Sequence, residues 1–280
     1  MNQRHTGDAN DAPLLAAPEL VCPAGSLRAL QAAVGAGADA LIVADTAVMG
    51  YCRDHHPTLR LHLSVQASAT SHAAIEFYRS RYGIQRAVLP RVLTLQQVGE
   101  VVRHTKVDVE VFGFGSLCVM VEGRCTLSSY VTGQSPNNAG VCSPPSAVRW
   151  QEGPDGVQSR LNSVLIDVYA PDEPRGYPTL CKGRFLVDGQ RGYAIEEPTS
   201  LNTLAILPEL LALGVKAIKI EGRQRSAAYV EQVTRVWRAA IDQACASGGR
   251  YSVQAGWSAA LARHAEGQQH TLGAYDRPWR

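Results

Sequence analysis

The sequence predicts an α/β fold, specifically a parallel β/α barrel of the TIM-barrel type that is short of two strand-helix units. Short apolar segments alternate with amphipathic helical segments, and parallel strands require such crossover helices. The 280 residues are close to the roughly 250 that this barrel needs. However, the pattern contains only six strands, whereas the closed form has about eight.

The six expected strands begin close to residue 20 and follow one another along the chain. They cover residues 20–25, 40–45, 61–68, 86–91, 109–115 and 216–222. Residues 1–18 mix Asp, Asn, Ala and Pro without any period, and we expect them to form a disordered tail. The remaining residues, 19–280, are expected to form a single barrel-like domain.

Helices are expected between these strands, and their ends carry recognisable signals. One helix ends at Gly83, and another begins at Thr94, which has Gln97 at the spacing of a capping box. A leucine-rich helix is expected over 201–213. The last helix begins at Ser226, and its buried face is expected to carry Tyr229, Val233, Val236, Trp237, Ala240 and Ile241.

Composition argues against several classes of protein. The 27 Lys and Arg residues nearly balance 25 Asp and Glu, so bulk attraction to nucleic acid or to an anionic membrane is not expected. No apolar run approaches the roughly 20 residues that span a bilayer, and the first residues lack a signal-peptide core. We therefore expect a cytoplasmic protein with no membrane span and no nucleic-acid partner.

Four of the seven cysteines stand apart from the others. Cys22, Cys52 and Cys245 fall in ordinary strand or helix segments, whereas the other four occur in a Gly-, Pro-, Ser- and Thr-rich region over about 116–190, after the fifth strand. In a reducing cytosol, thiols serve metal binding, catalysis or packing. The four cysteines of this region are Cys118, Cys125, Cys142 and Cys181.

Four thiolates suit either a tetrahedral zinc ion or a four-iron cluster. The wide and irregular spacing of these cysteines lacks the close pairs of a zinc knuckle and favours the cluster. A role as small buried hydrophobic residues remains an alternative for Cys118 and Cys125.

Polar residues at the ends of several strands indicate a possible substrate rim. In a β/α barrel, the carboxyl ends of the strands carry the chemistry. The candidate rim residues are Gln66, Arg91, Glu221 and Arg223, which would suit a small polycarboxylate or a phenolate. For each arginine, a solvated or helix-capping charge is the alternative. Neither an HExxH nor a GxSxG motif occurs, so peptidase activity receives no support and no catalytic residue can be named.

The motif ExFxxGSLCxxxxGxCxLS over 110–128 resembles the signature of the collagenase-like peptidase family. The resemblance extends to GVCSPP at 140–145, YPTLCKGRFLVDG at 177–189 and KIEGRQRSAAYV at 219–230. These segments are most similar to the UbiU branch of that family, which acts in oxygen-independent ubiquinone biosynthesis. The resemblance covers nearly all of residues 19–280.

The resemblance implies a 4Fe-4S cluster held by Cys118, Cys125, Cys142 and Cys181. It also implies ring hydroxylation of a quinone precursor without oxygen, in a heterodimer with a UbiV-like protein and together with a UbiT-like lipid carrier. Prephenate is implied as a donor of the hydroxyl oxygen. Two alternatives remain: an RNA-hydroxylating relative of the same family, and a non-catalytic protein whose cluster is structural.

One departure from the branch concerns the start of the barrel. Related sequences continue from the first GADA, here at 37–40, through two further strand-helix units to a second GADA. Here GADA runs directly into LIVAD at 41–45, as though that block were lost. The strand over 20–25 should then lie next to the strand over 40–45, which matches the shortfall of two strands.

Overall fold

The computed structural model describes residues 21–23, 27–35, 38–221, 225–246, 250–267 and 269–276. The expected tail over 1–18 lies outside these residues. The six strands expected from the sequence all form, and all are parallel. β1 (Val21–Pro23), β2 (Ala40–Val43), β3 (Arg60–Leu63), β4 (Arg86–Val88) and β5 (Asp108–Ser116) pair in chain order, and β12 (Ala217–Ile220) pairs with β5.

Several helices begin at a capping side chain that satisfies terminal backbone groups. The capping box of Thr94 and Gln97 is present at the start of α4, and Gly83 ends α3 with a φ of 72°. The side chain of Asp45 accepts hydrogen bonds from the first turn of α2. The bounds are α1 (Leu27–Gly35), α2 (Thr46–His55), α3 (His72–Tyr82), α4 (Leu95–His104), α7 (Leu207–Ala212), α8 (Ala227–Ala246) and α9 (Ala255–Ala262).

The prediction of a helix over 201–213 is wrong for the first residues of that range. Residues 199–202 instead form β11 (Thr199–Asn202), which runs antiparallel to the end of β5, with Leu201 opposite Gly115. Leu201 is buried with Val88 and Phe112 on the sheet, and this burial outweighs its preference for a helix. The α-helix therefore begins only at Leu207, after one 3-10 turn.

A closed barrel is not seen among the described strands. β13 (Gln269–Thr271) pairs in parallel with β11, which places a mixed β11–β13 arm beside the parallel strands. Across the described residues, no strand pairing joins β12 or β13 to β1. The mixed α/β class is thus confirmed, with β1 directly beside β2 as expected from the sequence.

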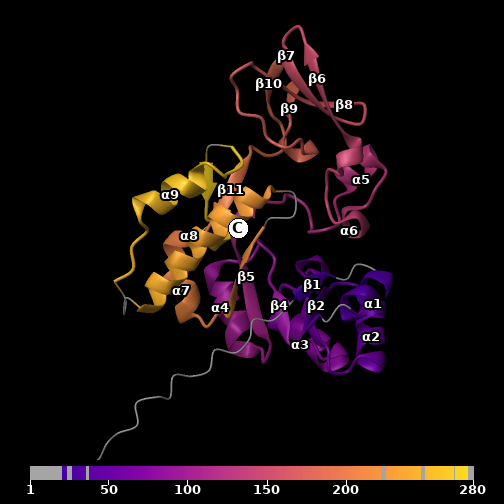
Figure 1. The fold of residues 1–280 in the computed structure, drawn as a ribbon, viewed down its shortest axis with the longest axis vertical. Coiled ribbons are helices and arrows are strands. Elements are labelled where there is room, and N and C mark those ends of the chain that lie inside the picture. The colour runs from indigo at the N-terminus through magenta and orange to yellow at the C-terminus, as the bar shows by residue number, and fades with distance from the viewer. Residues whose placement is uncertain are drawn as a thin grey trace, which may run out of the picture.

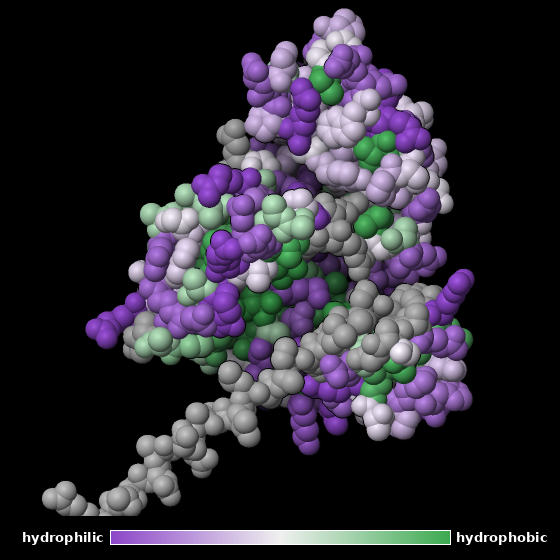
Figure 2. Space-filling model, in the orientation of Figure 1, coloured by the Kyte–Doolittle hydropathy of each residue, from purple (hydrophilic) through white to green (hydrophobic). Residues whose placement is uncertain are grey.

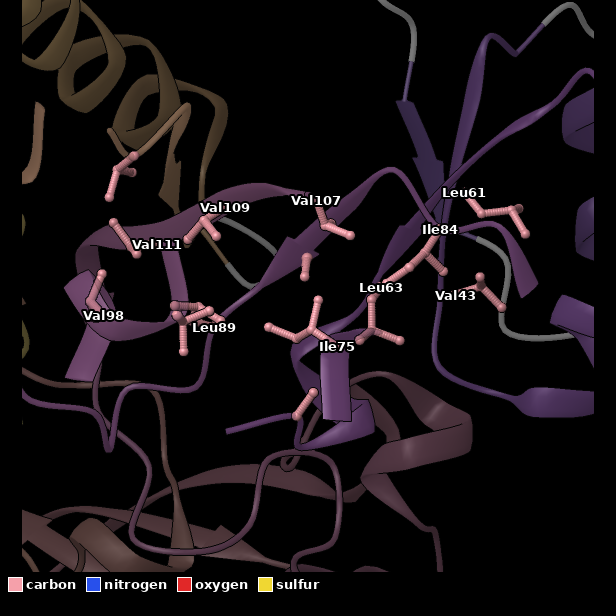
Figure 3. Packing of buried hydrophobic residues seen from close by; sticks show 14 of the residues in the cluster. Val43, Leu61, Leu63, Ile75, Ile84, Leu89, Val98, Val107, Val109 and Val111 are labelled. Atoms are coloured by element: carbon pink, nitrogen blue, oxygen red, sulfur yellow. The ribbon is translucent and has the colours of Figure 1, made fainter. Parts of the chain in front are cut away.

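Two apolar cores flank this sheet. The larger core packs β2 to β5 against α2, α3 and α4, and Figure 3 shows its side chains, among them Leu63, Ile75 and Val109, gathered between strands and helices. The second core packs Phe114 of β5 against α7, α8 and α9. Tyr229, Val233, Val236, Trp237 and Ala240 of α8 are buried there as predicted, and Ile241 packs at the edge.

Residues between β5 and β11 form a lobe beyond the carboxyl end of β5 (Figure 1). This cysteine lobe contains one three-stranded antiparallel sheet and one hairpin. Its outer surface is largely hydrophilic (Figure 2). Its elements are α5 (Thr126–Thr132), α6 (Pro136–Ala139), β6 (Val148–Gly153), β7 (Gly156–Leu161), β8 (Val164–Tyr169), β9 (Arg184–Val187) and β10 (Gln190–Tyr193).

Within the described part of the chain, no helix has both the length and the apolar character needed to cross a membrane.

Candidate functional site

The four cysteines of the predicted cluster lie in four different segments at the base of the cysteine lobe. Cys118 follows the end of β5, and Cys142 follows α6. Cys125 caps the start of α5, where its Sγ accepts a hydrogen bond from the Ser128 amide at 3.3 Å. Cys181 lies in the short 3-10 turn Leu180–Lys182. All four are free thiols; Cys118 is exposed and the others are half-buried.

The thiols lie close enough for their charges to act on one another. Burial is the main reason that the pKa of Cys118, of Cys142 and of Cys181 is raised, to about 12 for Cys181. Negative charge on Cys118 further raises the pKa of both Cys142 and Cys181, and charge on Cys125 raises that of Cys118 and Cys142. These mutual effects indicate that the cysteine segments lie near one another in the fold.

Four thiols from separate segments are a donor set of the kind that a four-iron cluster takes. In the described ranges, no three His, Cys, Asp or Glu side chains converge tightly enough to hold one metal ion. A zinc ion requires all four sulfurs at about 2.3 Å from one point, whereas a cubane cluster spreads them over four irons. Hydrogen bonds from the Met120 backbone and the Ser143 side chain act to lower the pKa of Cys118 and of Cys142, but burial outweighs them and the pKa of both thiols is raised.

Arg91, predicted as a rim residue, is enclosed by carboxylates. Its guanidinium donates to both oxygens of Glu122 at 3.0 Å and to Glu221 at 2.8 Å, and also to the Ser116 carbonyl. It lies 4.2 Å from the centre of the Phe112 ring, and only 11% of its side chain is exposed. Arg91 therefore anchors the loop between Cys118 and Cys125. It has no free pair of N–H donors for a bidentate contact with a substrate carboxylate.

The other predicted rim residues make different contacts or lie outside the described residues. Gln66 packs on Gly123 of the cysteine loop, where a Cβ would lie 2.8 Å from the Gln66 Nε2; Gly123 also has a φ of +77°. The positive φ favours glycine there, and a Cβ would also force the Gln66 side chain to move. Glu221 directly follows β12, and its amide donates to the Phe114 carbonyl at 3.0 Å. Arg223 lies outside the described residues.

A polar pocket of about 230 Å³ adjoins the cysteine loop. It opens between the carboxyl ends of β2 and β3, helix α3 and the segment that carries Cys125. In the described parts of the chain, the Arg124 guanidinium at this pocket has neither a hydrogen bond nor an ion pair. The lining residues are Ala44, Asp45, Thr46, Gln66, Ala67, Tyr78, Arg124 and Asn137.

Most residues that line this pocket are not among those predicted from the sequence. Only the position of Arg124 directly before Cys125 could have indicated it. Thr46, Tyr78 and Asn137 come from three separate helices, and nothing in their local sequence brings them together.

Comparison with known proteins gives one family and several relatives. The model of peptidase family U32 matches residues 25–276. The tRNA hydroxylation protein P of Escherichia coli K12 is 31% identical over 240 residues, which cover 79% of this chain and 52% of that protein. The tRNA hydroxylation protein P1 of Bacillus subtilis 168 is 29% identical, covering 82% of this chain and 48% of that protein.

An archaeal relative, the uncharacterized protease MJ0090 of Methanocaldococcus jannaschii, is 34% identical over 76% of this chain and 46% of its own length. The chain thus spans about half the length of the curated relatives it matches. No solved structure matches it.

Proposed function

Because the chain belongs to peptidase family U32, in which matched relatives are named tRNA hydroxylation proteins, we propose that it takes part in an oxygen-independent hydroxylation dependent on a 4Fe-4S cluster. The observation that supports the proposal is that Cys118, Cys125, Cys142 and Cys181, from separate segments beyond the end of β5, lie near enough for their charges to interact. Such a cluster supplies one-electron chemistry when bound. The cytoplasm, where thiols stay reduced, is the compartment this proposal requires.

For the substrate, we favour the aromatic ring of a quinone precursor. The motifs around the four cysteines are similar to those of the UbiU branch, and this supports a UbiV-like partner in a heterodimer and a UbiT-like lipid carrier. Exposed apolar side chains in the segments that follow the ligands also support an apolar substrate or partner. Val119 and Val121 follow Cys118, and Leu186, Val187 and Ile195 follow Cys181.

The hydroxyl oxygen requires a donor other than dioxygen, and prephenate is our candidate. Arg91 is fully engaged by Glu122 and Glu221, so it is not the residue that we assign to this donor. The polar pocket beside Cys125 is better suited, because it offers the Arg124 guanidinium together with amide and hydroxyl groups. Arg124 would bind one carboxylate of the donor, while Gln66 and Asn137 would orient its polar groups.

RNA hydroxylation is the second candidate, and the names of the relatives favour it. The polar lining of the pocket is also compatible with the edge of a nucleobase, since it offers both donors and acceptors. A third reading, a structural cluster without catalysis, predicts a loaded protein that is inactive on either substrate.

The experiment is anaerobic purification followed by iron and acid-labile sulfide analysis and two activity assays. We expect about four irons and four sulfides per chain. The loaded protein, mixed with a UbiV-like partner, prephenate as the oxygen donor and a two-electron acceptor, should hydroxylate a quinone precursor and leave unmodified tRNA unchanged. Stoichiometric zinc without sulfide would refute the cluster, and hydroxylation of tRNA alone would transfer the assignment to the second candidate.

A further inference from the structure

A partly buried chain of ion pairs connects Cys181 to the end of β5. Lys182 directly follows Cys181, and only 7% of its side chain is exposed. Its Nζ donates to Oε2 of Glu266, whose Oε1 accepts from Arg225 at 2.6 Å. Arg225 also donates to the Ser116 hydroxyl at 3.2 Å, two residues before Cys118. The chain thus runs from one cysteine segment to another through Glu266.

Glu266 is held firmly at the centre of this chain. It comes from the segment between α9 and β13, and its amide donates to the Ser200 hydroxyl of β11 at 2.7 Å. Arg225 is fixed in turn by the Tyr229 ring, whose centre lies 5.3 Å from its guanidinium carbon. The side chains of Glu266 and Arg225 are 19% and 22% exposed, so water screens their charges only partly.

Positive and negative charges are unequal in number within this chain of ion pairs. One carboxylate faces two cations, Lys182 and Arg225. Although burial opposes its ionisation, the charge of Lys182 and its hydrogen bond hold the pKa of Glu266 below its ordinary value. Glu266 is therefore an anion in this arrangement, and it offsets the positive charge next to Cys181.

We infer that Glu266 is a positioning residue for the cluster. Glu266 holds Lys182 beside Cys181 and offsets the charge of Lys182, so that this ion pair sets the reduction potential of the cluster. This inference rests on the proposed function, because it presupposes the cluster. Net charge around an iron-sulfur cluster is one of the main determinants of its potential, since positive charge favours the reduced form. The effect of each partner should therefore have an opposite sign.

The test measures the midpoint potential and iron content of anaerobically prepared variants. Glu266→Gln removes a negative charge and should shift the potential upward. Lys182→Gln removes a positive charge and should shift it downward. The double variant should return close to the wild-type value, and Lys182→Arg, which keeps the charge, should stay near it.

The matched control is Glu231→Gln, which breaks an exposed ion pair with Arg235 on α8 and should leave the potential unchanged. Unchanged potentials in both single variants, or shifts of the same sign, would overturn the inference while leaving the cluster in place. If Glu266→Gln does not retain iron, the comparison of Lys182→Gln with Lys182→Arg decides the sign of the effect. A wild-type protein without iron and sulfide would overturn the proposed function, and the inference with it.

Discussion

The parallel sheet and the cysteine lobe are stabilised in different ways. The sheet from β2 to β5 shares one large apolar core with α2, α3 and α4. The lobe has a small buried cluster that contains Ala147, Leu161 and Ile166. It depends much more on polar contacts, in which Asp167 accepts from both Arg184 and Arg191 at 2.7 Å.

This difference predicts which region depends on the proposed cluster for its stability. Apolar burial contributes about 25 cal/mol per Å², so we expect the sheet to fold without a metal group. A lobe with little apolar area must draw its stability from other sources, and metal ligation supplies folding free energy directly. We therefore expect loss of the cluster to loosen the lobe and spare the sheet.

The largest effect should come from removing one ligand. Cys142→Ala should lose nearly all cluster iron, since every iron of the cubane requires its own thiolate. Limited proteolysis should then cut within the lobe, while the sheet stays resistant. Cys245→Ala, at an exposed cysteine on α8, is the control and should retain full iron content. A loaded Cys142→Ala protein would contradict the ligand assignment.

A cavity in the apolar core should reverse this pattern. Leu63 on β3 is completely buried, and Leu63→Ala should lower the free energy of unfolding by about 2–5 kcal/mol. Under native conditions, the folded variant should still bind its full iron content. Urea denaturation followed by fluorescence, with iron analysis of the same samples, measures both quantities. Loss of iron at full stability would show that the two regions are not independent.

Removing the central carboxylate of the lobe should have a smaller effect. Asp167 is 3% exposed and pairs with Arg184 and Arg191, of which Arg191 is 45% exposed. Asp167→Asn should cost about 2 kcal/mol, less than a fully buried pair, because water screens one partner. Thermal melts of the loaded and the metal-free protein should show the larger loss in the metal-free form.

The smallest effect concerns one carboxylate at the sheet side and depends on pH. Hydrogen bonds from the Lys106 amide and from Arg79 lower the pKa of Glu76 to about 2. Because this pKa lies below its value of about 4.5 in the unfolded chain, Glu76 stabilises the fold at neutral pH and loses that effect as the pH falls toward 2. Glu76→Gln should cost about 1 kcal/mol at pH 7 and less at pH 3, as measured by urea denaturation. An equal cost at both values would exclude this ionic contribution.

The local structure of the sheet side could be predicted from the sequence. Six parallel strands, the Thr94 capping box, the Gly83 stop and the buried face of α8 all depend on residues within a few positions of one another. The four candidate ligand cysteines could also be recognised from local sequence, because they lie in a Gly-, Pro-, Ser- and Thr-rich region between β5 and β11. Their ligand role remains a prediction.

Other features were decided only by contacts between distant segments. Leu201 lies in a strand because it pairs with β5 and is buried there. Arg91 is enclosed because Glu122 and Glu221, from two different loops, both form ion pairs with it. The pocket around Arg124 and the bond between Lys182 and Glu266 likewise unite segments far apart in the chain. Local sequence determines which backbone conformation is favoured, but the burial and pairing of a charge depend on which groups the completed fold places around it.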